Sequence, residues 1–176
     1  VDLGSNSFRL HIGHYDGERI RILSTAREPV RLGAGLDRRG NLTAAAMESA
    51  LACLHRFGEI LRSQPLTAVR VVGTNTLRIA KNRDSFLPLA EKAIGCPIEI
   101  LSGEEEGRLI YLGVASLLDD AGERRLVVDI GGGSTELVLG HGNHIEQVES
   151  FGIGTVKTAL EFFGGDRITE SAFAGA

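Results

Sequence analysis

Apolar and polar positions alternate near the start of the chain and then change to helical spacing. Over residues 8–12 every second side chain is apolar, which predicts a strand with one buried face. After Thr43, a plausible N-cap, apolar side chains recur at the spacing of an amphipathic helix. These side chains are Met47, Leu51, Leu54, Phe57 and Leu61. The pattern therefore predicts a strand near the start and a long helix after it.

Shorter segments of both kinds fill the rest of the chain. Asp16-Gly17 is a turn signal for a hairpin. Strands are expected over residues 20–24, 29–32, 68–72, 97–101 and 145–148. Helices are expected over residues 77–80, 84–94 with an interruption near Pro88, 104–118, 155–163 ending at Gly164-Gly165, and 169–176.

The order of these elements predicts the fold class. A three-strand meander followed by strands that alternate with helices gives a mixed sheet with helices packed on it, an α/β architecture. The opening order of three strands and a helix recurs after the polar stretch 119–123, where we expect a domain boundary. The sequence thus predicts a first domain over residues 1–120 and the N-terminal part of a second, incomplete domain over residues 121–176.

An acidic residue followed by three glycines joins two apolar runs in the second domain. The runs 126–128 and 137–139 predict two strands, with Asp129 and the stretch 131–134 at the turn between them. Glycines without Cβ atoms let backbone N–H groups approach and surround an anion. A carboxylate beside a phosphate is typical of a Mg²⁺ site. The alternative is a tight hairpin in which Asp129 only forms an Asx turn.

The same pattern opens the chain, which makes a chance turn a poorer explanation. Val1 to Gly13 laid without gaps on Val128 to Gly140 matches at Val, Asp, Gly, Ser, Leu and the final Gly. An internal repeat of this spacing predicts two domains of one ancestry. Each would present an aspartate at a strand end and a turn rich in N–H groups, and the two turns would hold a chain of phosphates between them.

Composition narrows the classes of partner. The 176 residues carry 43% hydrophobic and 24% charged side chains, ordinary values for a globular protein. A net charge of −4 and a pI near 5.8 give no sign of general nucleic-acid binding. No apolar run approaches the ~18 residues of a membrane span. Cys53 and Cys96 lie outside any metal-type spacing, which fits a reducing cytoplasm, so we expect a cytoplasmic protein.

Two further polar clusters contain candidate residues, and each has a structural alternative. Arg78 follows Thr74 at the end of an expected strand, where a guanidinium can bind a phosphate or simply lie on a solvated helix face. Ser102 and Glu105 form an S-x-x-E capping box, so spacing alone leaves Glu105 as a helix cap or a general base. Glu136 can hold Mg²⁺ with Asp129 or pair with a cation across the sheet.

Four stretches together resemble the exopolyphosphatase/guanosine pentaphosphate phosphatase (Ppx/GppA) family, in the family's order and through nearly the whole chain. They are Val1-Asp2-Leu3-Gly4-Ser5-Asn6-Ser7, Gly73-Thr74-Asn75-Thr76-Leu77-Arg78, Ile98-Glu99-Ile100-Leu101-Ser102-Gly103-Glu104-Glu105-Glu106 and Asp129-Ile130-Gly131-Gly132-Gly133-Ser134-Thr135-Glu136. The resemblance implies an actin-like (ribonuclease H-like) duplicated domain with a mixed five-stranded sheet. It also implies Mg²⁺-dependent hydrolysis of terminal phosphate from inorganic polyphosphate or from guanosine pentaphosphate.

The resemblance also implies roles by position. Glu105 matches the catalytic base, and Asp129 and Glu136 match the acids around the metal and the attacking water. Glu104 stands where many relatives have a polar neutral residue. The phosphate-binding groups match Gly4, Ser5, Asn6, Ser7, Thr74, Asn75, Arg78, Gly131, Gly132, Gly133 and Ser134. Arg78 would also stabilise charge in the transition state. Relatives often pair, which leaves a homodimer open.

Two other functions stay open at this point. An actin-like kinase or ATPase domain would transfer phosphate to a sugar or drive motion, and would need an adenosine pocket. A non-catalytic paralogue would bind polyphosphate or the nucleotide without turnover. The presence of Glu105, Asp129 and Arg78 argues against the paralogue, because no group that the chemistry needs is visibly missing.

Overall fold

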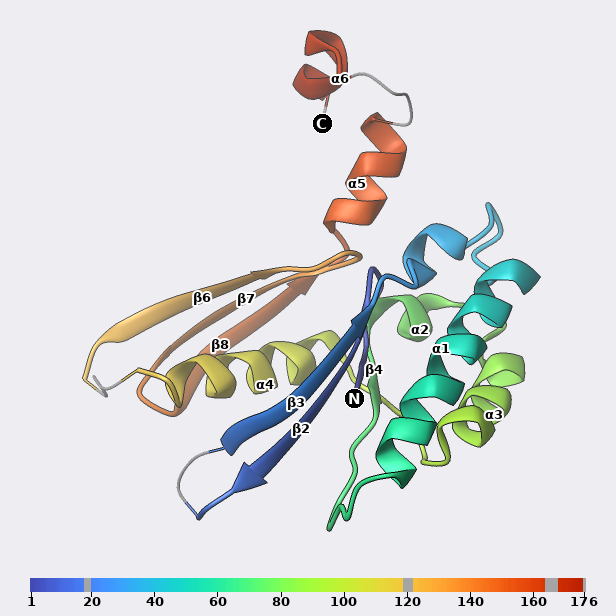
Figure 1. Ribbon diagram of the computed structural model, residues 1–176. Helices are drawn as coiled ribbons and strands as arrows, with labels where there is room; N and C mark the ends of the chain where they lie inside the picture. Colours follow the sequence, from blue (N-terminus) through green and yellow to red (C-terminus); the bar gives the residue numbers. More distant parts are fainter. Residues whose placement is uncertain (18–19, 119–121, 164–167, 176) are drawn as a thin grey trace. The chain divides into compact units, whose positions relative to one another are not determined.

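The chain forms two compact units, each built on a sheet of its own. The computed structural model describes residues 1–17, 20–118, 122–163 and 168–175. The first unit is Val1–Leu101 and the second is Ser102–Ala176 (Figure 1). Both units combine strands with helices, so the expected α/β class is confirmed.

The first unit contains the mixed five-stranded sheet expected from the resemblance. Its strands, in the order β3-β2-β1-β4-β5, are Ile20–Glu28, Phe8–Tyr15, Asp2–Leu3, Val72–Gly73 and Glu99–Ile100. β1, β2 and β3 pair in antiparallel fashion, whereas β1, β4 and β5 are parallel. The carboxyl ends of the parallel strands therefore meet at one edge of this sheet.

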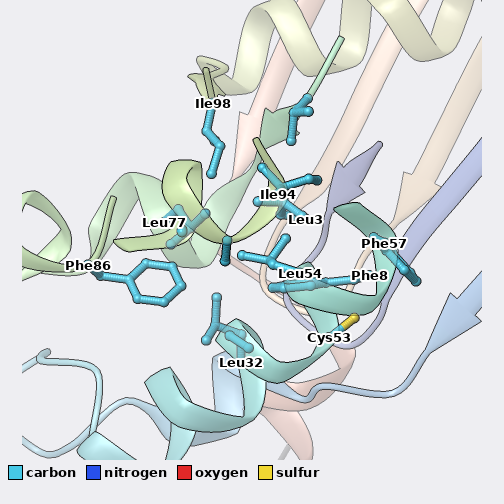
Figure 2. Packing of buried hydrophobic residues seen from close by; sticks show 14 of the residues in the cluster. Leu3, Phe8, Leu32, Cys53, Leu54, Phe57, Leu77, Phe86, Ile94 and Ile98 are labelled. Atoms are coloured by element: carbon cyan, nitrogen blue, oxygen red, sulfur yellow. The ribbon is translucent and has the colours of Figure 1, made fainter. Parts of the chain in front are cut away.

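Helices cover the apolar face of the first sheet. The described elements are the 3₁₀ helix η1 (Leu32–Gly35) and the helices α1 (Ala44–Arg62), α2 (Asn75–Ile79) and α3 (Arg83–Ile94). Thr43 caps α1 as predicted, since its side chain accepts a hydrogen bond from the Ala46 amide. In Figure 1, α1 and α3 lie side by side. Figure 2 shows the core that results, in which Phe8 of β2 and Leu54 of α1 are fully buried.

The second unit is a three-stranded antiparallel meander with a helix on one face. Its strands are β6 (Arg124–Ile130), β7 (Thr135–His141) and β8 (His144–Phe151), and its helices are α4 (Gly103–Ala115), α5 (Thr155–Phe162) and α6 (Glu170–Gly175). Tyr111 and Ala115 of α4 pack with Val138 of β7. Nearer its N-terminus, α4 approaches β7 at Gly107, where an added Cβ would lie 3.4 Å from Glu136 Cβ.

Backbone pairing shows that the sequence repeat is also a structural repeat. Asp2 pairs with Arg9 in the first hairpin, and the equivalent Asp129 pairs with Glu136 in the second. In each copy the pairing between the second and third strands shifts register at the last matched glycine. The shift lies between Ile12 and Gly13 of β2 in the first copy, and between Leu139 and Gly140 of β7 in the second. Such a shift is a β-bulge, which raises the local twist of a hairpin. The two copies thus share turn, register and bulge.

Three local predictions were wrong. Residues 29–32 do not continue the meander, because Arg31 adopts a left-handed conformation and η1 begins at Leu32. α3 is continuous through Pro88, since its buried face, with Phe86 and Ala90, packs into the core and offsets the missing N–H. The strand expected over 68–72 is confined to β4, because each of its partner strands pairs over two residues only.

Two other expectations fall partly outside the described residues. The boundary expected within 119–123 includes residues 119–121, and the helix end expected at Gly164-Gly165 lies wholly in an undescribed stretch. α4 ends at Ala115 rather than at residue 118. The division of the chain into evolutionary domains after residue 120 stays a prediction.

Candidate functional site

The bend between β1 and β2 carries the first set of predicted phosphate-binding residues. Gly4, Ser5, Asn6 and Ser7 form this bend, and the two serines are buried. Ser5 Oγ accepts a 2.7 Å hydrogen bond from Thr76 Oγ1 at the start of α2. The first bend is therefore fixed to the neighbouring parallel strand's end, as the topology predicts.

The second set in this unit lies on α2. Thr74 precedes the helix and is buried, and Asn75 is its first residue. Arg78 Nη1 donates a 2.7 Å hydrogen bond to the carbonyl oxygen of Leu101. This bond orients the Arg78 guanidinium at the end of β5, beside Leu101. The first unit thus brings the bend and α2 together at one sheet edge.

The second unit brings the predicted acids together at its glycine bend. Gly131, Gly132, Gly133 and Ser134 join β6 to β7, and Ser134 is buried. Gly131 N–H donates a 2.9 Å hydrogen bond to Ser134 O, which closes the bend.

Asp129 and Glu136 are direct cross-strand partners beside this bend and therefore point to the same face of the sheet. Like charges at such positions are destabilising, and a cation between them would remove that cost.

Glu136 is the most deeply buried charged residue of the described chain. Only 1% of it is exposed, and Oε1 accepts a 2.8 Å hydrogen bond from Ser150 Oγ of β8. Its other oxygen, Oε2, is buried and has no hydrogen-bond partner within the described residues. α4 passes over this carboxylate at Gly107, where an added Cβ would lie 3.4 Å from Glu136 Cβ. This buried acceptor can therefore take a further bond from a cation or a water.

Glu105 lies in the first turn of α4, close in sequence to that contact. Ser102 caps the helix and accepts a 3.1 Å hydrogen bond from the Glu105 amide. The Glu105 carboxylate itself is held by Arg108, whose Nε and Nη2 donate bonds of 2.7 and 2.8 Å to Oε2 and Oε1. These bonds raise the pKa of the Arg108 guanidinium. The expected cap is present, and it involves the Glu105 backbone while the side chain pairs with Arg108.

The acids fit the metal that the resemblance implies. Within the described ranges, no three His, Cys, Asp or Glu side chains gather as a complete metal site. Mg²⁺ does not need one, since it commonly keeps several waters and binds one or two carboxylates together with substrate phosphates. Asp129 and Glu136, with the open Oε2, match that requirement. The assignment of Mg²⁺ to these residues stays a prediction.

Three residues that contact the candidate site were not predicted from the sequence. Thr76 binds Ser5, Ser150 binds Glu136, and Arg108 binds Glu105. Arg108 was detectable in principle, because residues three apart on a helix are neighbours. Ser150 was not, because its position opposite Glu136 depends on the register of a bulged strand pair.

No helix of the described residues has the length and apolar character that a membrane crossing requires. That finding agrees with the absence of long apolar runs in the sequence.

Comparisons with known proteins agree with this α/β fold. An exopolyphosphatase from Cytophaga hutchinsonii is 30% identical, with a TM-score of 0.91 over 99% of this chain and 56% of that one. The PPX-GPPA enzyme of Aquifex aeolicus is 33% identical, with a TM-score of 0.80 over 99% of this chain and 58% of that one. This chain thus spans little more than half the length of either.

A more distant likeness supports the fold alone. The PilM-PilN type IV pilus biogenesis complex matches with 14% identity and a TM-score of 0.60, over 98% of this chain and 66% of that one. The fold is the actin-like α/β fold. The model of the Ppx/GppA phosphatase family matches residues 12–176. With its twin hairpins, its mixed sheet and this match over most of its length, the chain belongs to the Ppx/GppA phosphatase family.

Proposed function

We propose that the complete protein releases terminal phosphate from inorganic polyphosphate or from guanosine pentaphosphate. Membership of a phosphatase family supports the reaction class. The similar structures include an exopolyphosphatase, which supports a polyphosphate substrate. The substrate is a proposal for the whole protein, because this chain spans 56% of that relative.

The carboxylate pair at the second bend is the observation that carries the proposal. Asp129 and Glu136 face each other across β6 and β7, and Glu136 Oε2 is buried without a partner in the described residues. Mg²⁺ held there would neutralise charge on the terminal phosphate. The N–H groups of Gly132 and Gly133, with the Ser134 hydroxyl, would bind its oxygens.

The first unit would contribute phosphate-binding groups of its own. Ser5, Asn6 and Ser7 offer N–H and hydroxyl groups, and the Thr74 hydroxyl and the Asn75 side-chain amide offer further donors. Arg78 would bind a phosphate oxygen and stabilise the charge of the transition state.

Glu105 would orient the attacking water and accept its proton late in the reaction. Its pair with Arg108 holds the carboxylate in one orientation. Catalysis of phosphoryl transfer depends mainly on positioning and on electrostatic stabilisation. An oriented carboxylate is therefore suited to this reaction.

The experiment compares Glu105→Gln with Glu104→Gln in the full-length protein. We expect Glu105→Gln to lower the rate of phosphate release by about 10²–10⁴-fold, the usual contribution of a general base, while polyphosphate still binds. Glu104→Gln is expected to keep most of the activity. Phosphate release from polyphosphate and from guanosine pentaphosphate would be measured in parallel, since the ratio identifies the substrate.

Two outcomes would overturn the proposal. Near-normal turnover by Glu105→Gln, with loss in Glu104→Gln, would move the role to the neighbouring carboxylate. Release of no phosphate from either substrate by the wild type, together with labelled sugar phosphate formed from ATP, would make the protein a kinase instead.

A further inference from the structure

The segment that leads into α5 is hydrogen-bonded to the bend formed by Gly131 to Ser134. Thr155 N–H donates a 3.0 Å hydrogen bond to Gly131 O, and Val156 N–H donates a 2.8 Å bond to Gly132 O. On the other side of the contact, Thr135 Oγ1 donates a 2.7 Å bond to Ile153 O. Residues 153–156 therefore hold the first two carbonyl groups of the bend, those of Gly131 and Gly132.

The direction of these carbonyls fixes the direction of the amides that follow them. All peptide bonds of the described residues are trans. In a trans peptide the C=O and the next N–H point in opposite directions. Because the carbonyls of Gly131 and Gly132 point to α5, the N–H groups of Gly132 and Gly133 point away from it. Two successive amides with a common direction are the arrangement that binds an anion.

The close approach of this segment to the bend depends on the missing Cβ of Gly154. A Cβ on Gly154 would lie 2.5 Å from Gly133 N and 2.6 Å from the carbonyl carbon and oxygen of Gly132. These are backbone atoms of the bend, so they cannot move aside as a flexible side chain would. Gly152 differs, because nothing lies within 4 Å of a Cβ built there.

In the first unit a later segment also holds carbonyls of the bend, but not at the same pair of positions. Gly33 N–H donates a 2.8 Å hydrogen bond to Ser5 O, and Arg31 N–H donates a 2.8 Å bond to Asn6 O. The amides of Asn6 and Ser7 consequently point away from the segment that enters η1. In the repeat, Ser5 corresponds to Gly132, so the carbonyl at this one position is held in both bends.

We infer that residues 153–156 form a clamp that positions the second bend for phosphate, with Gly154 as its essential positioning residue. The inference rests on the proposed function for the identity of the anion, but the clamp itself is a property of the backbone. The clamp occupies the first amides of α5, so the phosphate is bound by the bend and not by that helix N-terminus.

The test uses the full-length protein with Gly154→Ala and, as a matched control, Gly152→Ala. Two quantities are measured: the hydrogen-exchange rates of the amides in 131–134, and the KM and kcat for polyphosphate. We expect Gly154→Ala to speed exchange of the Gly131 amide and to raise KM at least about tenfold, as for a 1.4 kcal/mol loss. Gly152→Ala is expected to leave both near the wild-type values.

A second variant covers the case in which Gly154→Ala does not fold. Thr135→Val removes the hydroxyl that holds Ile153 O and keeps the side-chain shape, so exchange in the bend should rise and KM should increase several-fold. Unchanged exchange and unchanged KM in a folded Gly154→Ala protein would overturn the clamp. Faster exchange, in a protein whose wild type releases no phosphate, would keep the clamp and reject the proposed function.

Discussion

The two hairpins have the same backbone and opposite charge at one repeat position. Asp2 faces Arg9 in the first hairpin, whereas Asp129 faces Glu136 in the second. Arg9 is exposed, while Glu136 is 1% exposed. The first pair combines opposite charges, whereas the second combines two carboxylates, an arrangement that is destabilising unless a cation lies nearby. The duplication therefore supplies one turn geometry twice, and the two copies differ in the charge that faces the aspartate.

The largest effect that would sharpen this comparison is expected from Glu136→Gln. Loss of one carboxylate should weaken Mg²⁺ binding and lower phosphate release by roughly 10²–10³-fold, because metal charge stabilisation contributes several kcal/mol. The matched variant in the first hairpin, Arg9→Gln, should stay within about threefold, as exposed substitutions usually do. Both are measured by Mg²⁺ titration of phosphate release from the full-length protein. Equal effects of the two variants would show that the charge difference has no functional meaning.

A smaller effect is expected from Ser150→Ala. This change removes the hydroxyl that donates to Glu136 Oε1 and leaves the buried carboxylate with one bond fewer. Hydrogen bonds to charged groups contribute about 1.5–3 kcal/mol, so the Mg²⁺ concentration for half-maximal rate should rise about tenfold or more. Ser116→Ala is the control, because Ser116 is exposed and its hydroxyl binds only the Gly113 carbonyl. An unchanged Mg²⁺ titration with a lowered melting temperature would reduce Ser150 to a structural role.

The smallest functional effect is expected in the first bend, from Thr76→Val. Ser5 Oγ would lose its buried donor, which should cost about 1–3 kcal/mol of unfolding free energy while the rate of phosphate release changes little. Urea denaturation measures the cost, with Thr25→Val at an exposed position of β3 as the control. A large fall in the rate of phosphate release without loss of stability would mean that activity, and not only folding, depends on the hydroxyl of Thr76.

Local periodicity was enough to predict the elements that depend on their own sequence. α1, both hairpins and the Thr43 cap follow from residue spacing alone. The segment 29–32 was predicted wrongly because its conformation is determined by bonds from Arg31 and Gly33 to the first bend, far away in sequence. A left-handed arginine between a proline and a 3₁₀ helix leaves no signal in apolar spacing.

The candidate site could be predicted only in part from the sequence. The acidic glycine bends were detectable because the pattern occurs twice, and the buried partnership of Glu136 with Ser150 was not, because strand register is a tertiary property. Spacing left Glu105 between cap and base. In the structure Ser102 caps the helix through the Glu105 amide, and the Glu105 carboxylate is bonded to Arg108, so the role of Glu105 as a base stays a prediction.

The bulge before Gly13 and its counterpart before Gly140 have a consequence for tracing ancestry. Side chains along a strand change freely when their neighbours change, but an inserted residue in a ladder is hard to lose, since its removal would turn every later side chain to the opposite face. The extra residue lies on the third strand in each copy, Leu23 in one and Glu146 in the other, opposite the matched glycine. The separation between the aspartate and that glycine is therefore the same in both copies, and it would indicate a shared origin even where the side chains have diverged.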